Sequence, residues 1–137
     1  MPRRSARSQS RPAPASSCPC GAAAPYRDCC GRLHRGEAAA TTAEALMRSR
    51  FSAFSVGDAD YLLRTWHPST RPERVDLGRG TRWTRLEILE TTGGSAIHTE
   101  GTVRFRAHYV DHGTPGEMEE HSRFVRHAGA WTYAGAI

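Results

Sequence analysis

Lysine is absent from this chain of 137 residues, so all nineteen basic residues are arginine. No apolar run approaches the ~18–20 residues that a membrane-spanning helix needs, which excludes a helical integral membrane protein. Glycine-rich phosphate loops, nucleophile-elbow serines and HExxH motifs are also missing, and with them the enzyme classes that these motifs mark. The length suits one ordinary domain with a small appendage.

Acidic residues and large aliphatic side chains are both missing from residues 1–17. The basic residues of this segment are Arg3, Arg4, Arg7 and Arg11. They leave fifteen arginines against fourteen acidic residues over residues 18–137, a net charge of +1 compared with +5 for the whole chain. A segment without Leu, Ile, Val or Phe cannot offset the entropy of ordering, so we predict a disordered basic tail.

The tail also bears on location and partners. No apolar stretch follows its first arginines, which argues against an export signal and favours a cytoplasmic protein. A solvated arm is the simplest interpretation. The alternative is weak, salt-sensitive contact with RNA, DNA or an acidic protein, made through the arginines alone.

All four cysteines lie between residues 18 and 30, as Cys18-Pro19-Cys20 and Cys29-Cys30. A disulfide framework links distant parts of a fold, which this clustering does not permit. Zn²⁺ binds four thiolates at about 2.3 Å in a tetrahedron, and the spacing favours such a structural site. Reduced buried cysteines, short local disulfides and a redox or iron–sulfur centre are the alternatives.

Residues beside the cysteines suit a metal site. Pro19 stiffens the first cysteine pair, and Gly21 lets the chain turn out of it. Four thiolates around one Zn²⁺ carry a net charge of −2, which the nearby Arg27 and Arg32 can offset. Metal binding would supply folding energy that so short a segment lacks.

The segment CPCGAAAPYRDCCG, residues 18–31, resembles the SEC-C zinc motif, a short metal-binding module at the end of the SecA translocation ATPase and in several other bacterial proteins. The resemblance implies a SEC-C-like zinc-binding motif over residues 18–37. It implies that the ligands are Cys18, Cys20, Cys29 and Cys30, the last at a position where some members use His. Residues 22–25, Ala-Ala-Ala-Pro, depart from the Ser-Gly-Lys-Lys stretch that the motif frequently contains.

Two helices are predicted next. Residues 42–56 carry apolar side chains near helical spacing, and a threonine at the start can cap this helix. Gly57 ends it, and Asp58 can cap a second helix that Pro68 stops. Residues 68–80 are rich in Pro, Gly and charge and predict a loop.

Strands follow the helices. Val103, Phe105 and Ala107 alternate with charged residues, which is typical of a half-buried strand over residues 99–110. Other strands are predicted over residues 83–91, 117–127 and 131–133, with a turn over residues 112–116. Helices first and an antiparallel meander last predict an α+β fold in which one sheet face packs on the helices.

The body resembles the YchJ family of small bacterial proteins in four stretches. These are LMRSRFSAF at 46–54, DADYLLRTWHPS at 58–69, SRF at 122–124 and WTY at 131–133. The resemblance implies a nuclear transport factor 2-like domain over residues 38–137, a cone of helices packed on a curved antiparallel sheet. It implies no established enzymatic activity.

Cone folds of this class often enclose an apolar pocket. The candidates for lining it are Arg48, Arg50, Trp66, Trp83, His121 and Arg123. Within such a pocket, Asp60 could orient the imidazole of His67 beside the phenol of Tyr61 for acid–base chemistry. The simpler interpretation is structural, because Asp60 favours a helix start, His67 precedes a proline at a helix end, and arginines pair with acids.

Two functions are therefore compared. The favoured one is a cytoplasmic adaptor whose zinc-ordered motif presents a small surface to a protein or ribonucleoprotein, a function that requires no enzymatic activity. The alternative is a small-ligand binder or enzyme that uses the cone pocket. An open cavity with Asp60 facing His67 would favour chemistry, whereas a cone filled by Trp66 and Trp83 would favour the adaptor.

Overall fold

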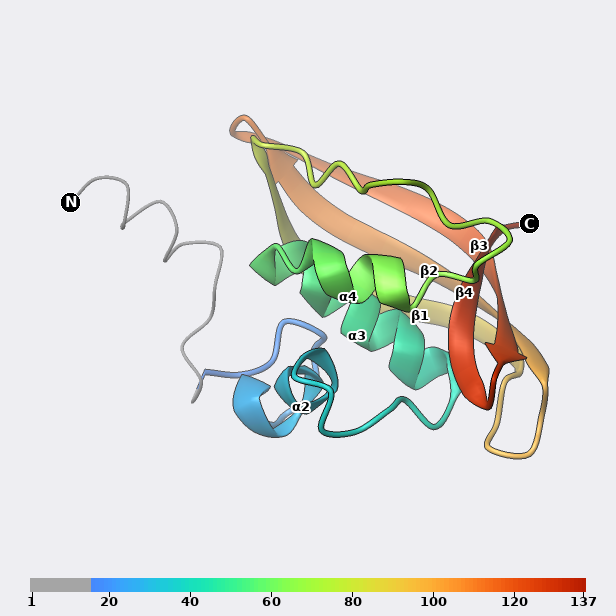
Figure 1. Ribbon diagram of the computed structural model, residues 1–137. Coiled ribbons are helices and arrows are strands. Elements are labelled where there is room, and N and C mark those ends of the chain that lie inside the picture. The colour runs from blue at the N-terminus through green and yellow to red at the C-terminus, as the bar shows by residue number, and fades with distance from the viewer. Residues whose placement is uncertain (1–15) are drawn as a thin grey trace.

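Four helical segments precede four strands in residues 16–137, the part of the chain that this computed structural model describes (Figure 1). In order they are η1 (Tyr26–Asp28), α2 (Cys30–His34), α3 (Ala43–Val56), α4 (Ala59–Arg64), β1 (Thr81–Gly93), β2 (Glu100–Asp111), β3 (Thr114–His127) and β4 (Ala130–Ala136). The strands form one antiparallel sheet in the order β1-β2-β3-β4, which confirms the predicted α+β class. No helix of this range is long and apolar enough to cross a membrane.

The helices begin at the capping residues. Thr42 Oγ1 accepts a hydrogen bond from the Ala45 N–H (3.0 Å) at the start of α3, and Asp58 Oδ1 accepts one from the Tyr61 N–H (3.0 Å) at the start of α4. Helix α4 ends at Arg64, whereas the sequence predicted that it would continue until Pro68 stops it. The backbone of residues 65–67 pairs with Tyr133 of β4 instead, and this pairing cannot coexist with a further helical turn.

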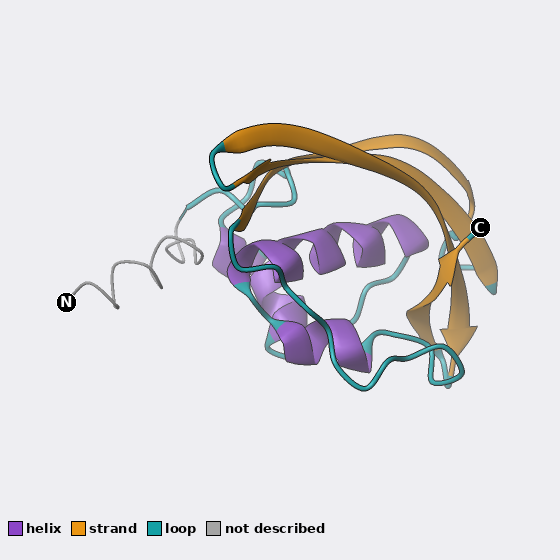
Figure 2. Ribbon diagram, turned by 90° about the horizontal axis from the view of Figure 1, so that it is seen from above, coloured by secondary structure: helices purple, strands orange, loops and turns teal. Residues whose placement is uncertain are grey.

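The sheet curves around the two longer helices (Figure 2). Its concave face carries the buried residues of β2 at every second position, Val103, Phe105 and Ala107, as the alternation predicted. Register irregularities interrupt β1 at two places and β4 at one, where Ala134 is the extra residue opposite Arg123 and Phe124. Bulges of this kind bend a strand, so they account for the curvature that turns the sheet into the wall of a cone.

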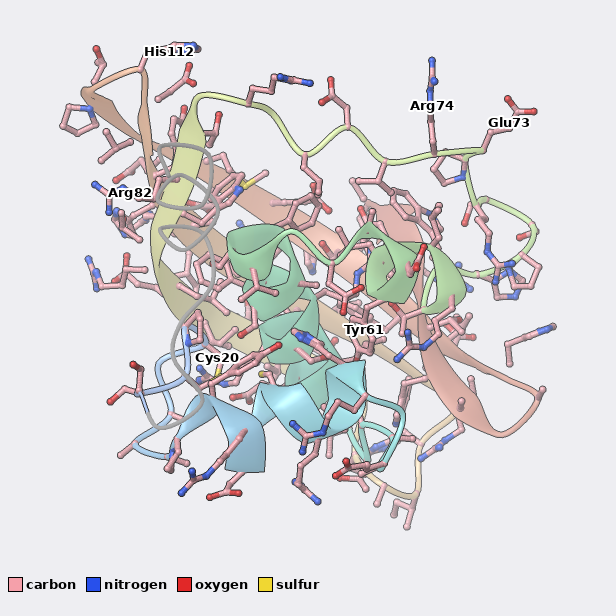
Figure 3. The ribbon with its side chains drawn as sticks, turned by 60° about the vertical axis from the view of Figure 1, so that its left-hand side comes forward. Cys20, Tyr61, Glu73, Arg74, Arg82 and His112 are labelled. Atoms are coloured by element: carbon pink, nitrogen blue, oxygen red, sulfur yellow. The ribbon has the colours of Figure 1, made fainter. Side chains whose placement is uncertain are left out.

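The hairpin between β2 and β3 is tighter than predicted. Its turn consists of His112 (φ 50°) and Gly113 (φ 87°), and Thr114, Pro115 and Gly116 already belong to β3. Two central residues with positive φ match the twist of the flanking strands, which allows a two-residue turn. The tip lies far from the cysteine-bearing end of the molecule, and Glu73 and Arg74 point outward from the loop over residues 68–80 (Figure 3).

The N-terminal segment over residues 16–37, which we call the knuckle, packs on α3. This helix lies between the knuckle and the sheet (Figure 1). The predicted disordered tail over residues 1–17 lies outside the described residues except for its last two. The Ser16 carbonyl accepts a hydrogen bond from Tyr26, and Ser17 bridges Pro25, so these two residues belong to the knuckle.

Candidate metal centre and the neighbouring cavity

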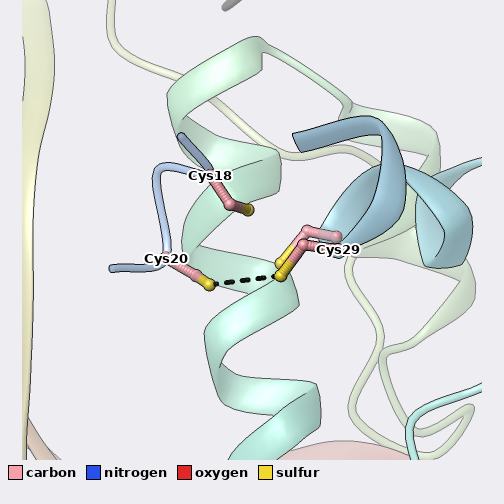
Figure 4. A group of neighbouring side chains, drawn as sticks. Cys18, Cys20 and Cys29 are labelled. Carbon is pink, nitrogen blue, oxygen red and sulfur yellow. Dashed lines mark hydrogen bonds between the residues drawn. The ribbon is translucent and has the colours of Figure 1, made fainter. Parts of the chain in front are cut away.

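Four cysteine side chains meet beside α3. Cys18 and Cys20 lie on the loop before η1, Cys29 lies between η1 and α2, and Cys30 is the first residue of α2. All four Sγ atoms lie within 4.8 Å of one another. The Sγ atoms of Cys20 and Cys29 are 3.7 Å apart (Figure 4). The structure therefore brings together the four residues that the sequence singled out as metal ligands.

The sulfur positions fit a tetrahedral metal ion. A tetrahedron with zinc–sulfur bonds of about 2.3 Å has sulfur–sulfur edges of about 3.8 Å. The 3.7 Å separation of Cys20 and Cys29 agrees with this edge. All four cysteines are free of disulfides, and Cys18, Cys20 and Cys30 are buried. This donor set can fill all four positions of a structural site.

The cysteines also alter one another's ionisation. Hydrogen bonds with Cys20 and Cys30 lower the pKa of Cys18. Burial, together with charge on neighbouring sulfurs, raises the pKa of Cys29 to about 12, and hydrogen bonding with Cys18 raises the pKa of Cys30. Negative charges this close disfavour one another, so four simultaneous thiolates require a cation among them.

Backbone hydrogen bonds shape the loop that carries the first two ligands. The Cys18 N–H donates to the Ala24 carbonyl (2.9 Å), and the Gly21 N–H donates to the Cys18 carbonyl (3.1 Å). Gly21 adopts a φ of 95°, which is the turn that glycine allows at low cost. The bridge between Ser17 and Pro25 closes the loop at its base. The spacing of Cys18 and Cys20 is thus fixed by the main chain.

Side chains of α3 hold this loop against the helix. Arg48 Nη1 donates to the Cys20 carbonyl (2.8 Å), and Arg48 Nε donates to Glu44 (3.0 Å). Ser52 Oγ lies 3.6 Å from Cys18 Sγ, where its hydroxyl can donate to a thiolate. Glu44, Arg48 and Ser52 follow one another at intervals of four residues, so they share one face of the helix. This four-residue spacing is the feature of the sequence that could have indicated a polar helix face in contact with the cysteine loop.

One prediction about arginines is corrected by this geometry. Arg48, predicted to line the pocket, binds the cysteine loop instead. Arg27 and Arg32 are exposed and contact Asp28, and their offsetting of the thiolate charge stays a prediction. The cation that reaches the cysteine loop comes from α3, because tertiary packing brings that helix closer than the adjoining segment's own arginines.

A buried histidine joins the knuckle to the helices. His34 Nε2 lies 2.9 Å from the Ser49 carbonyl, which only accepts, so this nitrogen carries the proton. His34 Nδ1 then accepts from the Tyr26 hydroxyl (2.6 Å). The imidazole also packs against the Tyr61 ring with centroids 4.6 Å apart. The sequence analysis did not single out His34, because no local pattern distinguishes a buried histidine from an exposed one.

A cavity of about 260 Å³ lies between α3 and the concave face of the sheet. Its apolar wall comes from α3 and strands β2 and β3, through Met47, Phe51, Phe54, Phe105, Ala107 and Met118. Arg50, Trp66 and Trp83, three of the predicted pocket residues, also line it. The cone is therefore open at its centre and is not filled by the tryptophans.

The polar groups of the cavity differ in whether their hydrogen bonds are satisfied. Arg50 is 4% exposed, and its Nη1 donates to the Leu62 carbonyl (2.8 Å) and to Thr65 Oγ1 (2.7 Å). Burial lowers the pKa of Arg50 to about 10, which leaves the guanidinium charged at neutral pH. The indole nitrogens of Trp66 and Trp83 are buried without a hydrogen-bond partner among the described residues.

A carboxylate and a phenol occupy another part of the wall. Glu120 Oε2 accepts from the Ser122 hydroxyl (2.6 Å) and from the Tyr133 hydroxyl (2.7 Å). Burial and the hydrogen bond to Glu120 raise the pKa of Tyr133. The Arg50 guanidinium lies 4.6 Å from the Tyr133 ring centroid. Neither Glu120 nor Tyr133 was predicted to line the pocket, although the alternation of side chains along a strand could have indicated Glu120.

The predicted catalytic residues do not meet. Asp60 is exposed in the first turn of α4, whereas the next residue, Tyr61, is buried and bonds through its hydroxyl to Ser49 Oγ (2.7 Å). His67 Nδ1 accepts from Ser69. None of the three lines the cavity. Successive helical residues point about 100° apart, so Asp60 and Tyr61 could not both face one site.

His121 and Arg123, also predicted for the pocket, are not among its lining residues. Both lie on β3, where Met118, Glu120 and Ser122 face the cavity. Side chains alternate between the two faces of a strand, so His121 and Arg123 point to the face opposite the cavity. Arg123 is exposed there and pairs with Glu100 (3.5 Å).

Comparisons with known proteins agree with this arrangement. The family model described as "YchJ, middle NTF2-like domain" matches residues 42–136. A UPF0225 protein from Streptomyces coelicolor is 62% identical over 121 residues, which cover 88% of this chain and 94% of that protein. A UPF0225 protein from Corynebacterium glutamicum is 52% identical over 117 residues, or 85% and 93% of the two chains.

Two solved structures resemble most of this chain. A SEC-C motif containing protein from Rhodopseudomonas palustris superposes with a TM-score of 0.78 and 29% identity, covering 89% of this chain and 98% of that one. A SEC-C motif containing protein from Psychrobacter arcticus gives a TM-score of 0.74 and 25% identity, covering 88% and 81%.

Proposed function

The chain belongs to the YchJ family, as its sequence predicted, and from this premise we propose that it is a zinc-dependent adaptor protein. The observation that carries the proposal is the meeting of four cysteine sulfurs within 4.8 Å. Zinc bound there would supply ordering bonds and no reactive position, because four protein ligands complete its coordination. The SEC-C motif in the names of the two similar structures supports the same assignment.

The outer surface of the knuckle is the part available to a partner. Its inner side is occupied by α3, through Arg48, Ser52 and the contacts of His34. Arg27 and Arg32 are exposed on the outer side. A metal bound to the four cysteines would hold η1 and α2, which carry these arginines, in a fixed arrangement. The knuckle would then present a defined charged surface to a protein or ribonucleoprotein.

The proposed location follows from the thiols. Four unpaired cysteines can serve as zinc ligands only where thiols remain reduced, which supports a cytoplasmic setting. The arginines of residues 1–17 would add weak nucleic-acid contact that depends on salt and not on sequence.

Metal analysis tests the zinc assignment. Protein purified under reducing conditions should contain about one Zn²⁺ per chain, and Cys29→Ser should lower this content sharply because three thiolates bind far more weakly. Ser52→Ala is the matched control, since it removes a contact to Cys18 without removing a ligand. Unchanged zinc in Cys29→Ser, or a metal-free native protein with a Cys18–Cys29 disulfide, would contradict the proposal.

Affinity capture tests the adaptor role on the same proteins. The baits are the intact chain, a deletion of residues 1–15, Cys29→Ser and the surface variant Arg27→Glu/Arg32→Glu. A partner of the knuckle should be retained by the deletion and lost from both knuckle variants, while any RNA should be lost from the deletion. Identical capture by all four baits would exclude the adaptor role.

A further inference from the structure

The cavity between α3 and the sheet contains a buried positive charge that no acid neutralises directly. Arg50 makes its hydrogen bonds through Nη1, to the neutral oxygens of Leu62 and Thr65. No ion pair joins it to an acidic side chain within residues 16–137, and the charge of Glu120 acts on it only from elsewhere on the cavity wall. Its Nε–H and Nη2 donors remain for another group. A buried arginine without an acidic partner is costly unless a ligand completes its interactions.

Two indole N–H groups on the same cavity are also unsatisfied. The Nε1 atoms of Trp66 and Trp83 are buried and have no acceptor among the described residues. The third tryptophan, Trp131, donates to the Thr41 carbonyl at 3.2 Å and does not line this cavity. Buried indole N–H groups normally find a partner. The cavity is thus lined by two tryptophans whose N–H groups lack acceptors and by a buried guanidinium that bonds only to neutral oxygens.

The rest of the wall is apolar and aromatic. Phe51, Phe54, Phe105 and Met118 surround a volume of about 260 Å³, slightly below the usual range for drug-sized ligands. Arg50 lies against the Trp66 ring, with Cζ 5.0 Å from its centroid, so the charge sits at an aromatic end of the cavity. A matching ligand is small, mostly apolar, and carries its acceptor oxygens at one end.

We propose that this cavity binds a small organic acid whose carboxylate accepts hydrogen bonds from Arg50, beside the indoles of Trp66 and Trp83. Its flat apolar body packs against the phenylalanines. The site is separate from the metal centre, because α3 presents Arg48 and Ser52 to the knuckle and Arg50 and Phe54 to the cavity. Its ligand binding can be tested independently of the adaptor role.

Glu120 sets the charge that the ligand can carry. Its Oε2 is held by the hydroxyls of Ser122 and Tyr133, on the wall that also bears Arg50. A second negative group on the ligand would be repelled by this carboxylate, so the site fits a monocarboxylate. Replacing Glu120 by Gln keeps an oxygen acceptor and removes the repulsion, and should therefore tighten binding.

The test follows the three indole N–H signals of zinc-loaded full-length protein by ¹⁵N–¹H NMR. The probes are phenylacetate and indole-3-acetate, with phenylacetamide as the uncharged isostere of the first. Both acids should shift the Trp66 and Trp83 signals and leave that of Trp131 in place, because its N–H is already bonded to Thr41. Phenylacetamide should bind about tenfold more weakly, since it lacks the charge-assisted hydrogen bonds.

Variants separate the charge from the shape of the cavity. Arg50→Gln should weaken phenylacetate binding about tenfold, whereas Glu120→Gln should strengthen it a few-fold. An altered Trp131 signal in Arg50→Gln would show that this variant does not fold. In that case Glu120→Gln still tests the proposal. Equal binding of acid and amide, weaker binding by Glu120→Gln, or immobile Trp66 and Trp83 signals at millimolar concentrations of both acids would overturn the proposal.

Discussion

Single buried polar side chains decide how the knuckle fits the helices. His34 has both ring nitrogens in hydrogen bonds, one to Tyr26 and one to the Ser49 carbonyl, and its side chain is 4% exposed. The neutral imidazole satisfies both partners, whereas a protonated one would place a second proton toward the Tyr26 hydroxyl. Burial lowers the pKa of His34 below its usual 6.5.

This geometry predicts a pH dependence of stability. Because the folded state holds His34 neutral, the unfolded chain takes up the proton first as the pH falls below 6.5, and folding becomes weaker. The unfolding free energy of the native chain should therefore decrease more steeply toward pH 5 than that of His34→Gln, by at most about 1.4 kcal/mol per pH unit. Chemical denaturation at a series of pH values measures both slopes.

The control replaces an exposed histidine. His112, at the tip of the β2–β3 hairpin, has a side chain that is 78% exposed, so His112→Gln should keep the native slope. Protonation of the cysteine ligands is common to all three proteins and cancels in the comparison. Parallel curves for the native chain and His34→Gln would show that His34 does not control this slope.

At the scale of elements, α3 is shared by two sites. Residues at four-residue intervals contact the cysteine loop, and a neighbouring face of the same helix lines the cavity. Its first residue, Ala43, also touches the β1–β2 connection, where the Ala43 N–H donates to the Gly94 carbonyl at 2.9 Å. The position of α3 is therefore fixed at its start by the sheet.

This contact predicts a difference between two glycines. Gly94 has a φ of 74°, and a Cβ atom there would lie 2.7 Å from the Cβ of Ala43, which is buried and cannot rotate away. Gly57 has a similar φ of 81° but open space around it. Gly94→Ala should thus cost more stability than Gly57→Ala, by about 1–3 kcal/mol, since both share the backbone strain and only one adds overpacking. Urea denaturation measures the two, and equal losses would refute the close contact.

At the scale of the whole molecule, the knuckle and the cone are mechanically joined. Arg64 of α4 donates to the Leu33 and His34 carbonyls at 3.0 and 2.9 Å, and α3 supplies the Arg48 and Ser52 contacts.

On the outer face of the sheet, arginines pair with glutamates across strands, as Arg106 does with Glu119. These pairs fit the near-neutral charge of residues 18–137.

Metal removal should therefore weaken the entire fold. If zinc is present at about 1,000 times its dissociation constant, it stabilises the native state by about 4 kcal/mol. Chelation under reducing conditions should lower the melting temperature of the single transition and speed hydrogen exchange in α3 around Arg48 and Ser52. Chelator added to Cys29→Ser should cause no further loss. An unchanged melting temperature on chelation of the native chain would show that the metal does not support the cone.

The sequence by itself determined where α3 and α4 begin, where the strands lie, and which four cysteines are the possible metal ligands. Caps and glycines are local signals, so Thr42, Gly57 and Asp58 could be assigned without the fold, and four cysteines in two close pairs carry their own chemistry. Only the tertiary structure decided which polar residues meet. Arg48 contacts the knuckle, Arg50 lines the cavity, and Asp60 is exposed to solvent. These surroundings depend on which face of a helix or strand each residue occupies and on what packs against that face.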